Sequence, residues 1–168
     1  MNVDPIYVYE RETDPEVVAR HGGPARPITR RTVRHPVLGV LTWSEVGKEW
    51  RGERKRGRGS YEIAIRAGET DEAKRDRAAA GAVAIEQRLA ELGGFAADAL
   101  LGLLNREWRE AGEAPVRRDT FVKRLRPATR AFDEDGSVRV FFSDGELFGG
   151  HSVVVELDSD LRPVDATI

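Results

Sequence analysis

The chain has 168 residues, enough for one domain, and 40% of them are apolar, so it can bury a core. One third are charged, but the signs nearly cancel to a formal net charge of −2, which argues against a partner held by the charge of the whole surface. The absence of cysteine excludes disulfides, thiolate metal sites and cysteine nucleophiles. The N-terminus lacks the apolar region of a secretory signal, and no run approaches the ~18 apolar residues of a membrane helix. We therefore expect a cytoplasmic protein that contacts no membrane.

Residues 1–36 differ in composition from the rest of the chain. Ile6–Glu10 has the composition of a short strand, and Asp14 followed by Pro15 is typical of a helix start. Residues 21–36 are rich in proline, glycine and arginine, which predicts an extended linker rather than a helix. We expect an N-terminal arm over residues 1–36 and a single domain over residues 37–168.

Two strands are predicted in the first part of this domain. Val37–Trp43 is apolar, and in Ser60–Arg66 apolar and polar side chains alternate. We expect them to pair antiparallel, with Arg51–Gly59 as the loop between them.

A helical hairpin is predicted next. Asp71–Leu92 has an apolar stripe at spacings of three and four, Thr70 as its N-cap and Gly93-Gly94 as its end. Phe95–Glu110 forms the second helix, and the short connection favours antiparallel packing of the two. Asp119–Leu125 is compatible with one or two further helical turns.

The remainder predicts strands joined by tight turns, and two Asp-Gly pairs mark the turns between them. The predicted strands are Ala128–Phe132, Ser137–Phe142, Gly150–Leu157 and Pro163–Ile168. The order of elements predicts an α+β fold, an antiparallel sheet with a helical hairpin packed on one face.

His151 is the first candidate for chemistry. It follows Gly149-Gly150 and lies near Asp144 and Glu146 in sequence, so a histidine–carboxylate pair could act as a general base or a metal site. The alternative is a structural histidine that hydrogen-bonds the backbone of the glycine-rich turn. The structural interpretation is favoured, because neither a second histidine nor a nucleophile lies near in sequence. We expect no cofactor and no metal.

A basic cluster is the second candidate. Clustered arginine beside tryptophan suits a nucleic-acid backbone and stacked bases, and it equally suits an acidic protein. A solvated hairpin loop is the alternative. The residues of this cluster are Lys48, Trp50, Arg51, Arg54, Lys55, Arg56 and Arg58.

Three stretches carry a resemblance to a known family. They are HPVLGVLTWSEVGKEWRG (His35–Gly52), LNREW (Leu104–Trp108) and DGELFGGHSVVVELDSDLRPVDATI (Asp144–Ile168). Together they resemble an uncharacterised bacterial family of unknown function, over roughly residues 35–168, although the glycine that often closes the last strand is missing here. The resemblance implies no activity, but relatives of this kind are suspected of acting as immunity-like binding proteins in bacterial conflict systems.

The sequence thus favours a non-catalytic, immunity-like protein-binding module over an enzyme. Nucleophile elbows, Walker loops, HExxH, CxxC and dinucleotide fingerprints are all missing from the sequence. The expected contact residues are the basic cluster together with Phe148 and His151. A His151-centred hydrolase or metal-dependent enzyme, and nucleic-acid binding by the basic cluster, are the two alternatives. The sequence determines neither the partner nor the oligomeric state.

Overall fold

The computed structural model describes residues 31–57, 59–110 and 112–168, apart from the side chain of Arg56. The strand predicted at Ile6–Glu10, the helix start at Asp14 and Arg58 lie outside these residues. Most of the predicted N-terminal arm lies outside them as well.

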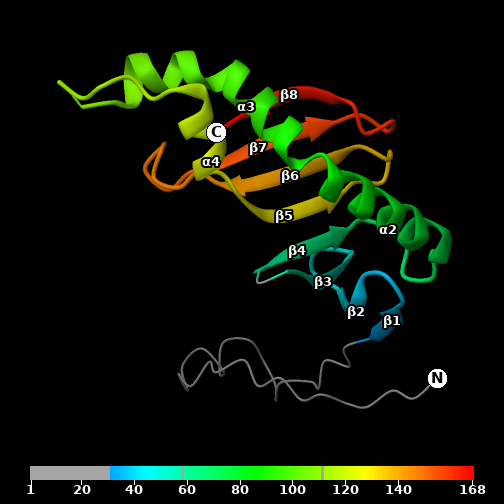
Figure 1. Cartoon of the computed structure of the whole chain (residues 1–168). Helices are drawn as coiled ribbons and strands as arrows, with labels where there is room; N and C mark the ends of the chain where they lie inside the picture. Colours follow the sequence, from blue (N-terminus) through cyan, green and yellow to red (C-terminus); the bar gives the residue numbers. More distant parts are fainter. Residues whose placement is uncertain (1–30, 58, 111) are drawn as a thin grey trace, which may run out of the picture.

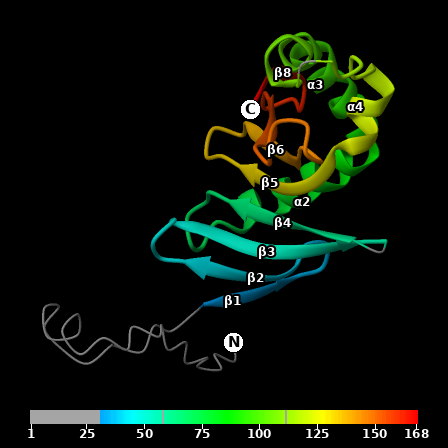
Figure 2. The same ribbon diagram turned by 90° about the vertical axis from the view of Figure 1, so that its left-hand side faces the viewer.

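Eight strands form one sheet whose order in space follows the order in the chain, as Figure 2 shows from β1 at the bottom to β8 at the top. All neighbouring strands pair antiparallel except β4 and β5, which pair parallel. The strands are β1 (Thr32–His35), β2 (Gly39–Ser44), β3 (Glu49–Arg56), β4 (Gly59–Ile65), β5 (Arg126–Phe132), β6 (Val138–Ser143), β7 (Ser152–Leu157) and β8 (Pro163–Thr167).

The helical segments lie between β4 and β5. They are α2 (Glu72–Gln87), α3 (Leu89–Leu103), the π-helical turn η1 (Leu104–Trp108) and α4 (Arg118–Arg124). A parallel pair needs a crossover connection, and the helices supply it. In Figure 1, α2 runs beside β4 and α3 beside β7 and β8. The α+β prediction with helices on the sheet is therefore confirmed, and among the described strands the parallel β4–β5 pair is the one departure from an antiparallel sheet. The two long helices do not pack against each other as the predicted antiparallel hairpin, because only Arg88 separates them and they follow one another across the sheet (Figure 1). None of the described helices is long and apolar enough to cross a membrane.

Alternating burial along the strands places the core on the helix side of the sheet. One row of partners crosses every strand from β2 to β8, and all but one of its residues are apolar or glycine. The row runs through Leu41, Gly52, Ile63, Arg130, Val140, Val155 and Ala166. Gly52 is required in it, because a Cβ there would lie 2.6 Å from Cδ2 of Leu41 and 2.8 Å from the carbonyl oxygen of Val40.

Two strands replace segments that the sequence predicted as linker and loop. One of them, β3, lies between β2 and β4, so the predicted direct pairing of these two strands is wrong. β1 lies in the Pro- and Arg-rich residues 21–36, and β3 occupies most of the predicted Arg51–Gly59 loop. In β3 the charged residues Arg51 and Glu53 alternate with inward Trp50 and Gly52. Because β3 has paired neighbours on both sides, backbone hydrogen bonds hold a strand whose composition indicates a loop.

The helix boundaries also differ from the prediction. The break between α2 and α3 falls at Arg88, and Gly93 and Gly94 lie buried inside α3. A Cβ on Gly93 would lie 3.3 Å from Val122, so these glycines allow close packing of α4 on α3 rather than ending a helix. The N-cap of α2 is Asp71, whose carboxylate accepts the N–H of Lys74 at 3.0 Å, and not Thr70.

Candidate functional site

The turn between β6 and β7 is built around the carboxylate of Asp144. This side chain is buried and accepts three backbone hydrogen bonds, from the N–H groups of Glu146 (3.2 Å), Phe148 (2.6 Å) and Gly150 (3.1 Å). A charged acceptor with three donors fixes the path of the whole turn. Asp144 is therefore an organiser of the backbone, and its carboxylate is directed into the turn.

Glycine is required at particular points of this turn. Gly145 has φ of 58°, and a Cβ there would lie 2.7 Å from the carbonyl oxygen of Arg124, which leaves no room for a side chain. Gly150 has φ of 88° with open space beside it, so only its backbone conformation demands glycine. Gly149 also has a positive φ, of 63°, so both glycines before His151 adopt a backbone conformation that favours glycine.

The LNREW stretch meets this turn in space. Leu104–Trp108 forms the π-helical turn η1, a wider turn that is frequent at functional sites. The side chain of Asn105 accepts the N–H of Val116 at 2.8 Å and donates to its carbonyl at 3.0 Å, which holds the following segment in place. Two stretches of the family resemblance, about forty positions apart in the chain, are thus joined at one place.

Aromatic contacts join the LNREW stretch to the turn between β6 and β7. The ring of Trp108 meets Phe148 edge to face at 5.5 Å and His151 at 5.6 Å between centroids. Phe148 is fully buried and packs in turn on Phe121, whereas Trp108 is 39% exposed and His151 is exposed. We call the exposed group Trp108, Gly149, Gly150 and His151 the Trp108–His151 surface.

The Trp108–His151 surface offers aromatic contact area on a rigid base and does not assemble the predicted acid–base pair. Among the described residues, the carboxylate of Asp144 accepts hydrogen bonds from its own turn. The ring of His151 contacts Trp108, and its backbone N–H donates to the carbonyl of Phe148 at 3.3 Å. Glu146 is exposed with φ of 66°. Within the described part of the chain, no three His, Asp or Glu side chains gather where a metal could bind.

The basic cluster is divided between two faces of the sheet. Arg51 lies on the face away from the helices and pairs with Glu49 through Nε (2.7 Å) and Nη2 (2.6 Å). Arg54 lies on the helix face and binds Glu86 through Nε at 2.6 Å, a hydrogen bond that raises the pKa of Arg54.

The remaining members of this cluster are scattered too. Lys48 pairs with Glu45 at 2.8 Å, and this hydrogen bond holds the pKa of Glu45 below its ordinary value. Trp50 is buried against Trp43, with Arg75 over its ring at 5.1 Å, so it is a core residue. Lys55 is exposed. A single basic patch is therefore not formed by the described members, and their role in binding stays a prediction.

A buried polar cluster under the sheet was missed at the level of the sequence. The carboxylate of Glu86 on α2 accepts a hydrogen bond from Nε of Arg54 and another from the hydroxyl of Tyr61 at 2.5 Å. Nη1 of Arg130 lies 3.9 Å from the same carboxylate. The guanidinium of Arg130 stacks on the ring of Tyr61 at 3.4 Å and is 1% exposed. Its position could have been anticipated, because Arg130 shares the inward face of its strand with Phe132.

A clamp on the β1–β2 hairpin was also missed. Nδ1 of His35 accepts the N–H groups of Val37 (3.1 Å) and Leu38 (3.2 Å), and Nε2 contacts Asp76 of α2 at 3.0 Å. Arg54 donates to the carbonyl of Val37 as well. The HPVLG residues of the opening stretch thus fasten the hairpin to α2, which is a structural role.

The comparisons with known proteins agree with the resemblance. No curated protein and no solved structure matches the chain. The family model described as "Uncharacterized protein conserved in bacteria (DUF2262)" matches residues 35–168, which include the hairpin clamp, the π-helical turn and the Asp144-centred turn. The chain therefore belongs to the DUF2262 family of bacterial proteins.

Proposed function

We propose that this protein is a non-catalytic protein-binding module of the cytoplasm, and that the Trp108–His151 surface is its main contact. One observation carries the proposal: Trp108 stays 39% exposed although it anchors the junction of two family stretches. Tryptophan is among the residues that dominate the binding energy of protein interfaces. An aromatic side chain anchors a partner best when the structure beneath it is already rigid, because side chains and loops that become ordered on binding reduce the affinity.

The base beneath this surface is rigid for identifiable reasons. The carboxylate of Asp144 holds three backbone N–H groups of the turn, and the fully buried ring of Phe148 packs edge to face on Trp108. These contacts present Trp108 and His151 in one arrangement before any partner arrives. The same contacts favour binding over catalysis, because the carboxylate of Asp144 is already engaged by the backbone of the turn.

The specific form that we propose is an immunity-like protein whose partner is a protein toxin. Support for it comes from the family resemblance, and the identity of neighbouring genes is the first observation to make. A toxin gene directly beside this one favours the immunity form, and a conserved neighbour of another class counts against it.

Two single substitutions on the full chain test the proposal. We expect His151→Ala and Trp108→Ala each to abolish capture of a partner from the native host, with the circular dichroism spectrum unchanged. Val46→Ala serves as the matched control, because Val46 is almost fully exposed on a distant hairpin turn and its loss removes only a surface side chain. Retention of the partner by the His151→Ala, Trp108→Ala double variant refutes the proposed contact.

A further inference from the structure

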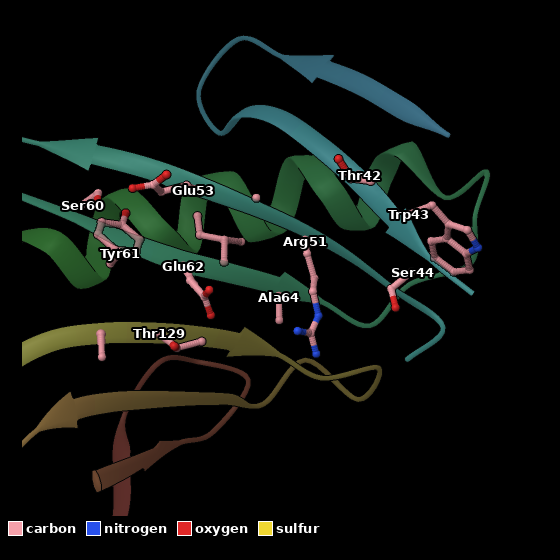
Figure 3. A pocket seen from close by; sticks show the side chains of 13 residues that line it. Thr42, Trp43, Ser44, Arg51, Glu53, Ser60, Tyr61, Glu62, Ala64 and Thr129 are labelled. Carbon is pink, nitrogen blue, oxygen red and sulfur yellow. The ribbon is translucent and has the colours of Figure 1, made fainter. Parts of the chain in front are cut away.

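The sheet has a second face that none of the described helices covers. Its side chains alternate with the core row and point away from α2, which lies behind the sheet in Figure 3. Over β3, β4 and β5 this open face is hollowed by about 740 Å³. Arg51, Glu53, Glu62 and Thr129 line the hollow together with small polar residues.

Two carboxylates oppose one another in this hollow. Glu53 of β3 and Glu62 of β4 are direct cross-strand partners, and both side chains are exposed. Like charges in this position destabilise a sheet. Among the ion pairs of the described residues, none involves Glu53 or Glu62, and the nearby Arg51 is already bound to Glu49 through two nitrogens. The hollow therefore carries an excess of negative charge that no ion pair among the described residues balances.

The row that contains this pair becomes apolar toward β7. The register continues from Glu62 through Thr129 to Phe141 on β6 and Val154 on β7, both half-buried. Neighbouring strands are spaced about 4.8 Å apart, so Phe141 lies about 10 Å from Glu62 and about 12 Å from the midpoint between Glu53 and Glu62. The open face thus presents an acidic pair and an apolar strip at a defined distance.

We infer that the open face of β3–β6 docks a segment of a partner protein that carries a lysine or arginine about 12 Å from an apolar side chain. The basic group lies between Glu53 and Glu62 and relieves their repulsion, while the apolar group covers Phe141. A divalent cation is the poorer fit, because hard cations take six or more oxygen ligands and the guanidinium of Arg51 borders the hollow. The residues of this open face are different from those of the Trp108–His151 surface, and the inference does not depend on that surface.

The probe for this inference is a fluorescein-labelled peptide, Gly-Lys-Ser-Leu-Ser-Leu-Ser-Gly, with a matched peptide in which glutamate replaces lysine. Extended chain advances about 3.3 Å per residue, so its two leucines lie about 7 and 13 Å from the lysine and bracket the required distance. Binding to the full chain is measured by fluorescence anisotropy at low and at physiological salt. We expect the lysine peptide to bind and the glutamate peptide to fail, with affinity falling as salt rises.

The decisive variants remove the acidic pair without changing its shape. Glu53→Gln with Glu62→Gln is expected to weaken peptide binding at least tenfold and to leave Tm no lower than that of the wild type, since a repulsion is removed. The matched control is Glu72→Gln with Glu134→Gln, two exposed carboxylates elsewhere that change the net charge equally. Equal affinity in the wild type and the Glu53, Glu62 variant overturns the inference, and so does an equal loss in the control.

Other occupants of the hollow give different results. Self-association of the wild type in sedimentation experiments, lost on removing the acidic pair, would assign the face to a second copy and overturn a partner protein as the occupant. If the Arg26→Gln, Arg30→Gln double variant binds the lysine peptide more tightly than the wild type does, the hollow is assigned to the chain's own basic residues. That result also overturns a partner protein as the occupant. Phe141→Ser is expected to weaken binding while its salt dependence is kept.

Discussion

Replacing Asp144 with alanine is the most informative perturbation of the fold around the candidate site. The carboxylate accepts the N–H groups of Glu146, Phe148 and Gly150 at 3.2, 2.6 and 3.1 Å. A hydrogen bond to a charged group contributes about 1.5–3 kcal/mol, so the three sum to roughly 5–9 kcal/mol if they are independent. Bonds that share one acceptor are not independent, and water can reach the two donors that are only partly buried. We therefore expect Asp144→Ala to lower the free energy of unfolding by about 3–5 kcal/mol.

Urea denaturation followed by circular dichroism measures this loss, and hydrogen exchange locates it. Exchange at the amides of residues 146, 148 and 150 should accelerate more than exchange in the core strands. Asp144→Asn should fall between wild type and alanine, because one of its two terminal groups is a donor and faces a backbone N–H. Ser143→Ala is the matched control, since Ser143 is exposed and immediately precedes Asp144. A loss no larger than that of the control refutes the view that this carboxylate organises the turn.

Three further predictions concern the clamp, the sheet and an ion pair. His35→Ala removes the acceptor of two backbone N–H groups and should cost about 1–3 kcal/mol in denaturant titration; a cost near zero contradicts the clamp. Gly52→Ala should cost about 2 kcal/mol or more, because its Cβ meets backbone at 2.8 Å, whereas Gly68→Ala, with its nearest neighbour at 3.9 Å, should stay within about 0.5 kcal/mol. The hydrogen bond from Arg118 lowers the pKa of Asp98, so Arg118→Gln should raise the NMR titration midpoint of Asp98 toward the ordinary value. In the wild type this pair stabilises the fold above the ordinary pKa of an aspartate and is lost as pH falls through the lowered value, and the variant should lose less stability in acid.

The fold class could be predicted because hydrophobic periodicity is a local property of the chain. The alternation in Ser60–Arg66 and the apolar stripe after Thr70 both appear as a strand and a helix at those places. β3 could not be predicted in the same way, since its charged residues face solvent on one side and its pairing with two neighbours is a tertiary interaction. The predicted helix end at Gly93-Gly94 was wrong for a related reason. Glycine often ends a helix, but inside α3 these glycines allow close contact with α4.

The sequence pointed to the turn between β6 and β7 but not to the roles of its residues. His151, Phe148 and Asp144 were singled out from the sequence, and the structure places all three in or beside one turn. Their roles could not be read from spacing, because the direction of the carboxylate of Asp144 depends on which backbone N–H groups surround it. The sequence marks Trp108 as the end of the LNREW stretch inside the second predicted helix, but its contact with His151 joins segments that no local pattern connects.

The sequence by itself determined the class of fold, the membership in a bacterial family and the glycine-rich turn, because all of these depend on local propensity and short motifs. Only the tertiary structure decided that Trp50 belongs to the core, that the basic residues of β3 divide between two faces, and that Trp108 lies on His151. The physical reason is that burial and charge pairing are set by neighbours from distant parts of the chain. The order of the strands and the crossover between β4 and β5 determine which residues become neighbours. Neither can be read from a single stretch of the sequence.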